Sequence, residues 1–166
     1  QNELALDSTI GYRLEAQFMF QQNQMEEAIR AIELGLKRDP QDEWLLENLA
    51  FARLSLKDKT GAQEVVENWI RLHPDTTKAL LVMAYLRYNE KNFIGALPYL
   101  QKIVQIGNSK GNDPHAAEAL FLMGQVYLQQ SQSVEAKNLF SQACNHGFTA
   151  ACSASSENVE PSEPSK

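Results

Sequence analysis

The chain has 166 residues, of which 43% are hydrophobic, so it is long enough to bury the core of one domain. Its formal net charge is −6 and its basic residues are scattered rather than clustered, which argues against nucleic acid as a partner. The longest apolar run, from Ala79 to Leu86, is far shorter than the ~20 residues needed to cross a bilayer, so no transmembrane segment is expected.

Small residues and prolines recur along the chain at a fixed interval. Small side chains at fixed positions let antiparallel helices approach closely, and a proline suits the junction between two helices. A period of about 34 residues is typical of helix–turn–helix units stacked into a solenoid. The interval of 34 separates the members of three columns: Ala16, Ala50 and Ala84; Ala28, Ala62 and Ala96; and Pro40 and Pro74.

Four helix pairs are therefore expected, in residues 9–42, 43–76, 77–116 and 117–147, with large apolar residues at helical spacing between the columns. The third unit departs from the period, because Ala136 follows Ala96 by 40 residues. The stretch from Gly107 to Asp113 is rich in Gly, Asn and Ser, so it is predicted to form a lengthened loop before a helix that opens at Pro114.

The two ends of the chain are expected to differ from the repeats. Residues 1–8 precede the first helix pair. Residues 148–154 are predicted to form a short capping segment, since the last repeat would otherwise leave an apolar face in water. Residues 155–166 are rich in Ser, Pro and Glu, a composition typical of disorder.

With these columns the chain resembles the tetratricopeptide repeat family. That family places a bulky residue, a Leu, a Gly or Ala, a Tyr, then Ala, an aromatic, Ala and Pro along each unit. Arg53 and Arg87 depart from the pattern, because they stand where the family has Tyr. The resemblance implies an all-α fold: a right-handed superhelical solenoid of about four helix–turn–helix repeats plus a short capping segment. The match is best in the fourth unit, at Leu120, Met123, Gly124, Tyr127, Ala136, Phe140 and Ala143.

In this family the first helix of each pair lines a concave groove that binds another protein, and the resemblance implies which side chains line it here. Phe51 and Tyr85 are equivalent residues of neighbouring first helices, and we expect them to form a ladder for a peptide or helix of the partner. The alternative is that such aromatics are buried in the core. The expected groove residues are Arg13, Gln17, Phe20, Trp44, Glu47, Phe51, Leu54, Lys78, Leu81, Tyr85, Tyr88, Phe121, Gln125 and Leu128.

No catalytic, cofactor-binding or metal-binding residues are expected. His73, His115 and His146 are far apart in sequence and lack the spacing of metal ligands. There is no phosphate loop, dinucleotide fingerprint or nucleophile elbow. Only Arg13 and Lys78 are basic among the groove residues, so the Lys and Asn clamp of co-chaperone domains, which holds a carboxyl terminus, is absent.

Cys144 and Cys152 lie eight residues apart, across the expected turn from the last repeat helix into the cap. This string resembles the Sel-like repeats of bacterial secreted proteins, in which a cysteine pair at this spacing joins adjacent helices. The resemblance implies a disulfide, and two buried reduced thiols are the alternative. A disulfide favours an oxidising compartment.

The first functional hypothesis is a non-enzymatic adaptor that docks a peptide or helix of a partner, in a bacterial envelope or secretion assembly. The cysteine pair and the missing start methionine favour this hypothesis, and with it a periplasmic or envelope-associated location over a cytoplasmic one. The second is a cytoplasmic chaperone, since the small chain resembles the tetratricopeptide-type chaperones of type III secretion substrates. The third is a self-associating scaffold, for which a homodimer is plausible.

Overall fold

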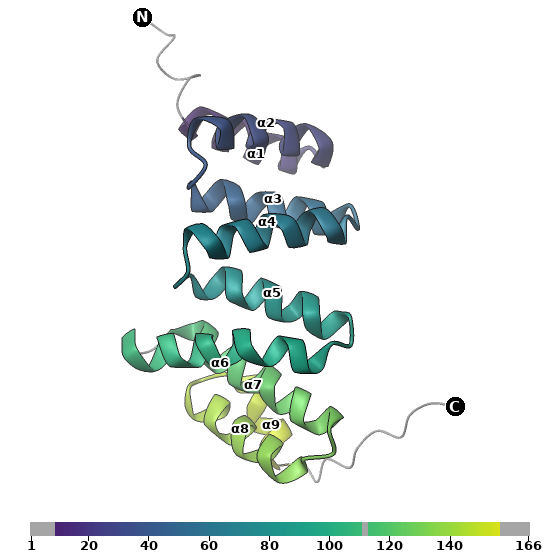
Figure 1. Cartoon of the computed structure of the whole chain (residues 1–166), viewed down its shortest axis with the longest axis vertical. Coiled ribbons are helices and arrows are strands. Elements are labelled where there is room, and N and C mark those ends of the chain that lie inside the picture. Colours follow the sequence, from purple (N-terminus) through teal and green to yellow (C-terminus); the bar gives the residue numbers. More distant parts are fainter. Residues whose placement is uncertain (1–8, 111–112, 157–166) are drawn as a thin grey trace, which may run out of the picture. The chain divides into compact units, whose positions relative to one another are not determined.

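The computed structural model describes residues 9–110 and 113–156. Within these ranges the chain is all-α and contains no strand, which confirms the predicted fold class. The described residues form nine helices, which are labelled in Figure 1. Their bounds are α1 Thr9–Gln21, α2 Met25–Arg38, α3 Glu43–Ser55, α4 Lys59–Leu72, α5 Thr77–Asn89, α6 Phe93–Lys110, α7 Pro114–Gln129, α8 Ser133–Asn145 and α9 Thr149–Ser156.

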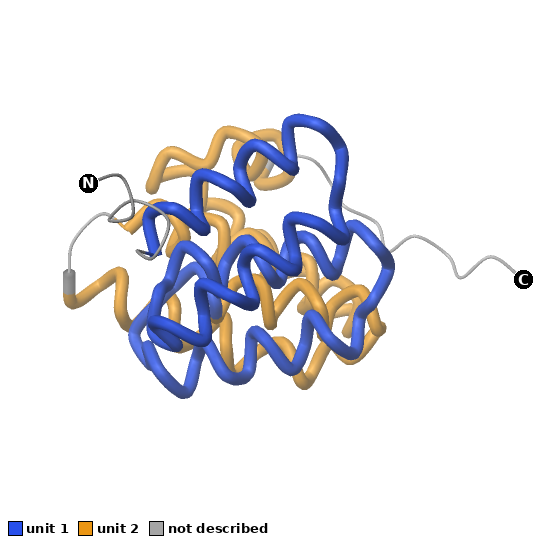
Figure 2. Tube along the Cα trace, turned by 90° about the horizontal axis from the view of Figure 1, so that it is seen from above, with its two compact units in different colours: residues 1–79 blue, residues 80–166 orange. Residues whose placement is uncertain are grey.

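The helices are divided between two compact units, Gln1–Ala79 and Leu80–Lys166, which Figure 2 colours separately. The first unit holds α1 to α4 and the first residues of α5. The second unit holds the rest of α5 and α6 to α9.

The first unit consists of two helix pairs packed through the predicted small residues. The predicted alanines are all fully buried, and their small side chains allow the helices to approach closely. These are Ala16, Ala28, Ala50 and Ala62. Around them the core is filled by larger apolar side chains, of which Trp69 is the largest. The side chain of an aspartate accepts a backbone hydrogen bond at the start of both α3 and α4, which satisfies N–H groups that a helix cannot pair internally.

The turn inside each helix pair has the same backbone conformation in all four pairs. One residue per turn adopts the left-handed conformation, with φ between 59° and 63°, and none of the four is glycine. The residue after it donates its N–H to a carbonyl in the last turn of the preceding helix. These left-handed residues are Asn23, Lys57, Lys91 and Ser131.

The second unit differs from the prediction at the junction of α6 and α7. The predicted lengthened loop is wrong in part, because α6 continues through Gly107 to Lys110 and has 18 residues against 14 in α4. A side chain on buried Gly107 would lie 2.5 Å from Cβ of Ala116, so this glycine allows α6 and α7 to pack closely instead of breaking the helix. The extra residues therefore mostly lengthen helices, and α7 begins at Pro114, where a helix was predicted to open.

The last described helix, α9, packs on α8 where the capping segment was predicted. It runs to Ser156, two residues beyond the predicted cap, so the expectation of disorder from residue 155 does not hold for the first two residues. The remaining predicted tail, 157–166, and the leading residues 1–8 lie outside the described residues.

Candidate functional site

The expected groove residues all lie on the first helix of a pair, namely α1, α3, α5 or α7. Most are at least partly accessible, and Phe51 and Tyr85 are among the exposed large hydrophobic residues. Leu81 is the exception, because only 7% of it is exposed and its side chain belongs to the core. Phe51 lies in the first unit and Tyr85 in the second, so the aromatic ladder between them stays a prediction.

In the first unit, the two basic groove side chains are engaged by carboxylates of the same unit. The Arg13 guanidinium of α1 contacts the Oδ2 atom of Asp42 through Nη2 at 2.6 Å and through Nε at 2.8 Å. Asp42 is buried at the start of α3 and also accepts the N–H of Leu45, so Arg13 compensates a carboxylate that is largely removed from water.

The second basic side chain, Lys78 at the start of α5, donates to both carboxylate oxygens of Glu47 on α3, at 3.1 and 3.0 Å. Both partners are predicted groove residues, and both are partly exposed, so the pair is screened by water. As a result, the charges of the predicted groove residues in this unit are almost fully balanced by neighbouring side chains.

In the second unit, the groove side chain that donates to a carboxylate is a tyrosine and not a basic residue. Tyr85 on α5 donates its hydroxyl hydrogen to Oε1 of Glu118 on α7, at 2.6 Å. Burial of the side chain, and next the hydrogen bond to the negatively charged Glu118 carboxylate, raise the pKa of Tyr85 far above the ordinary tyrosine value. The hydrogen bond fixes the direction of the ring while part of the ring stays exposed to solvent.

Tyr88 and Phe121, two other predicted groove residues, are used mainly inside the second unit. The ring of Tyr88 packs edge-to-face on Phe93 of α6, with 5.1 Å between centroids, and burial raises its pKa. Phe121 lies between Phe140 and Phe148, at centroid distances of 5.3 and 5.1 Å. Phe121 therefore supports the capped end of the unit, as does the predicted groove residue Leu128, which packs on the same cluster.

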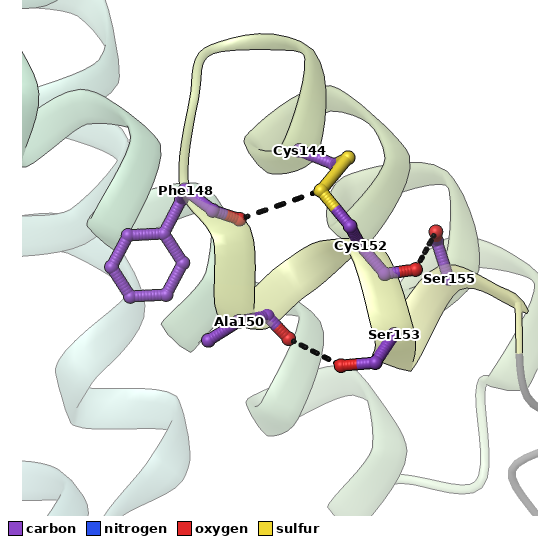
Figure 3. Close-up of a disulfide and its surroundings, with 6 residues drawn as sticks. All are labelled: Cys144, Phe148, Ala150, Cys152, Ser153 and Ser155. Carbon is purple, nitrogen blue, oxygen red and sulfur yellow. Dashed lines mark hydrogen bonds between the residues drawn. A yellow bond between two sulfur atoms is a disulfide. The ribbon is translucent and has the colours of Figure 1, made fainter.

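The capped end is closed by a disulfide between Cys144 of α8 and Cys152 of α9, drawn in Figure 3. The two Cα atoms are 4.8 Å apart, and the Cys152 sulfur lies 3.9 Å from the carbonyl oxygen of Phe148 in the intervening turn. Gly147 in that turn has a φ of 89°, a conformation that suits glycine. The bond thus holds the turn that places Phe148 against Phe121.

A family model described as "Tetratricopeptide repeat" matches residues 75–146, a range that includes all of α5 to α8. These residues are tetratricopeptide repeats. The match confirms the resemblance that was drawn from the residue columns.

Solved structures share this fold over most of the chain. MamA from Desulfovibrio magneticus RS-1 is 23% identical, with a TM-score of 0.70 over 85% of this chain and 76% of that one. PilF of Pseudomonas aeruginosa is 18% identical, with a TM-score of 0.71 over 84% and 61%. The TPR2B domain of yeast Sti1, solved in complex with pHsp70, is 23% identical, with a TM-score of 0.64 over 73% and 97%. No curated protein sequence matches the chain.

The solved structures thus show the same all-α repeat fold as this chain. Among the described residues, no three His, Cys, Asp or Glu side chains are grouped as a metal site would require. Over the same part of the chain, no helix has both the length and the apolar character needed to cross a membrane.

Sequence reasoning missed two residues that organise the first helices, Asp42 and Glu118. Glu118 was detectable, because it stands in the same repeat position as Trp44 and Lys78 once the six additional residues of the third unit are counted. Asp42 was recognisable from the sequence as a helix-start residue after Pro40, but its contact with Arg13, 29 residues away, depends on the packing of α1 against the next repeat.

Proposed function

We propose that this chain is a non-enzymatic module that binds a peptide or helix of a partner protein along its first helices. The observation that carries the proposal is that Phe51 of the first unit and Tyr85 of the second are each exposed, at equivalent positions of the second and third repeats. Exposed aromatic side chains on a rigid helix lose little conformational freedom on binding, so they are favourable anchors for a partner.

The charges around these anchors point to the chemistry of the bound segment. Arg13 is engaged by Asp42, and Lys78 by Glu47, so neither cation is available without breaking an internal pair. A partner carboxylate would have to compete with these carboxylates, whereas apolar side chains need only cover the rings. This balance supports an apolar, uncharged segment as the ligand rather than an acidic tail.

The disulfide supports the adaptor hypothesis over the chaperone hypothesis. Structural disulfides persist in oxidising compartments and are rare in the cytosol. A chain that carries the Cys144–Cys152 bond suits a bacterial envelope or secretion assembly, which is where we place the adaptor. A cytoplasmic chaperone of a type III secretion substrate would carry both thiols reduced.

The experiment uses the full chain as bait in an extract of the source organism, with identification of the retained protein by mass spectrometry. The retained protein is then purified, and its affinity is measured by calorimetry at low and high salt. The test variant is Phe51→Ala with Tyr85→Ala. The matched control is Ile94→Ala with Val134→Ala, which removes two exposed apolar side chains from the second helices α6 and α8.

We expect the test variant to lose affinity about 30-fold or more, since one aromatic anchor contributes about 2 kcal/mol or more. Helicity should stay unchanged, the control should bind like the wild type, and high salt should weaken binding little. Equal loss in both variants would show that the groove assignment is wrong. Binding abolished by salt would show instead that the partner is recognised through its charge. Free thiols in the protein purified from its source would favour the chaperone.

A further inference from the structure

The carboxylate of Glu118 on α7 has one partner among the described residues, the hydroxyl group of Tyr85 at 2.6 Å. A hydroxyl group donates a hydrogen bond but brings no positive charge, so the charge of this carboxylate is not balanced by an ion pair. The Glu118 side chain is only partly accessible to solvent, and a partly buried carboxylate is stabilised when a cation pairs with it. Glu118 differs in this respect from the groove carboxylate of the first unit, which has such a partner.

The repeat before Glu118 shows why the charge stays unbalanced. Glu118 stands at the repeat position of Lys78, and Lys78 donates to Glu47 on the preceding first helix. The residue of α5 that corresponds to Glu47 is Leu81, which follows it by 34 residues and belongs to the core. The position that could hold a charged partner for Glu118 on α5 is therefore filled by an apolar side chain.

The other titratable or charged side chains of the first helices in this unit, apart from the tyrosines, are engaged elsewhere. Glu118 is the only Asp, Glu, Lys or Arg of α7. His115, three residues earlier on the same helix, contacts Oδ1 of Asp113 through Nδ1 at 3.0 Å. On α5, Arg87 contacts Oε2 of Glu90 at 3.2 Å. Neither His115 nor Arg87 pairs with Glu118.

The aromatic ring of Tyr85 lies directly beside this carboxylate. Tyr85 is 37% exposed, and its hydrogen bond places the Glu118 carboxylate at the hydroxyl end of the ring. The face of an aromatic ring attracts a cation, and the attraction is stronger where water is partly excluded. Burial is the main cause of the raised pKa of Tyr85, so water is partly excluded at this pair and the hydroxyl group keeps its proton. Ring and carboxylate thus favour the same kind of ligand, a cation.

We propose that Tyr85 and Glu118 form a subsite for one basic side chain of the bound segment, an arginine in preference to a lysine. A guanidinium group can lie on an aromatic ring while its N–H groups donate to a carboxylate, and it is less strongly hydrated than an ammonium group. This inference rests on the proposed function, and it adds one positive charge to an otherwise apolar ligand. The internal ion pairs that argue for uncharged side chains belong to the first unit, whereas this subsite belongs to the second.

The subsite is expected to contribute selectivity more than affinity. A partly exposed ion pair combined with a cation–π contact should raise the affinity for the bound segment about fivefold. A single pair of this kind also gives only a weak dependence on salt, in agreement with the small effect of salt expected for the whole ligand. The position of the basic residue relative to the apolar side chains of the ligand is therefore the property to measure.

The test is selection of a random library of short peptides, displayed on phage, against the full chain. The wild type should select peptides that carry one Arg or Lys at a fixed distance from apolar residues. In the test variant Glu118→Gln, the amide oxygen can still accept the Tyr85 hydroxyl hydrogen, but the charge is lost. This variant should select the same apolar residues without the basic one. The matched control, Glu135→Gln, removes an exposed carboxylate of α8 that has no partner among the described residues, and it should select like the wild type.

One selected peptide then serves as a defined probe in calorimetry, in a form with arginine and in a form with citrulline, which has nearly the same shape but no charge. The wild type should bind the arginine form about fivefold more tightly than the citrulline form, and Glu118→Gln should bind both forms equally. A second variant, Glu118→Lys, reverses the charge and should select an acidic residue in place of the basic one. Circular dichroism checks that each variant is folded.

The outcomes separate the subsite from the proposed function. Peptides that need Phe51 and Tyr85 but carry no basic residue, or that bind Glu118→Gln as tightly as the wild type, would overturn the subsite alone. Peptides that bind equally well to the variant with Phe51→Ala and Tyr85→Ala would overturn the proposed function and the subsite with it. A library that yields no specific binder would also count against both.

Discussion

Removal of the Cys144–Cys152 disulfide should release α9 while the rest of the second unit stays folded. Apart from this bond, α9 is held by few groups: Ala151 is its fully buried residue, and Phe148 in the preceding turn packs on Phe121. The helix has only eight residues, five of them Ser, Thr or Cys, and a helix of this length is unstable in water on its own. The covalent bond is therefore expected to be its main constraint.

The magnitude follows from the length of the closed loop. The bonded cysteines are eight residues apart, and the chain-entropy relation gives about 2.5 kcal/mol for a loop of this size. If the loss falls on the docking of α9 alone, the open state of α9 becomes roughly 70-fold more populated. Global stability should change much less, because α6 to α8 keep their own core.

The assay is hydrogen exchange with mass spectrometry on the wild type, with and without a dithiol reductant, and on Cys144→Ala with Cys152→Ala. Peptides from α9 should exchange far faster in the reduced and double-variant samples, while peptides from α6 to α8 should change little. Unchanged protection of α9 would refute the argument that the disulfide holds it. Equal loss across α6 to α9 would refute the argument that α9 opens by itself.

Two further predictions concern the repeat turns and the tyrosines. Lys57→Gly should stabilise the protein by about 0.5–1 kcal/mol in urea unfolding, because Lys57 is held at a φ of 63°, which glycine adopts without strain. The control Glu64→Gly, inside α4, should destabilise the protein by about 1 kcal/mol. Stability changes of the same sign in both variants would contradict the argument that the turn is strained. In a spectrophotometric titration, Tyr85 should ionise only well above the ordinary tyrosine value of 10.0, and Tyr85→Phe should reduce the amplitude of this late phase. The Tyr85 hydroxyl keeps its proton to a higher pH in the folded state than in the unfolded state. The free energy of unfolding should therefore fall as the pH rises above the ordinary tyrosine pKa of 10.0, and it should fall less in Tyr85→Phe.

The fold was predictable because the residues that specify it recur at a fixed interval along the sequence. Ala28, Ala62 and Ala96 recur at the interval of the helix pair, and all three are fully buried where second helices meet first helices. The junction of α6 and α7 was misjudged for a local reason. Gly107 was interpreted as a sign of a loop, but its contact with Ala116 shows that packing between helices decided the conformation there.

The candidate site was less predictable, because side-chain pairs join residues about 30 positions apart. Arg13 and Lys78 were expected as groove cations, yet their carboxylate partners depend on how successive first helices pack. The assignment of Leu81 to the groove is wrong, since a helix face selected by spacing alone also includes a residue at its buried edge. Phe121 was assigned by family position, and the partner that covers it belongs to the cap.

The recurrent turn shows how this chain separates structure from recognition. Asn23, Lys57, Lys91 and Ser131 share one backbone conformation despite their different side chains, although a left-handed φ disfavours all of them relative to glycine. Packing of each helix pair must therefore impose the turn. If the backbone of each repeat is fixed in this way, substitutions on the exposed face of a first helix can change the partner without changing the fold, and this is why we place specificity in those side chains.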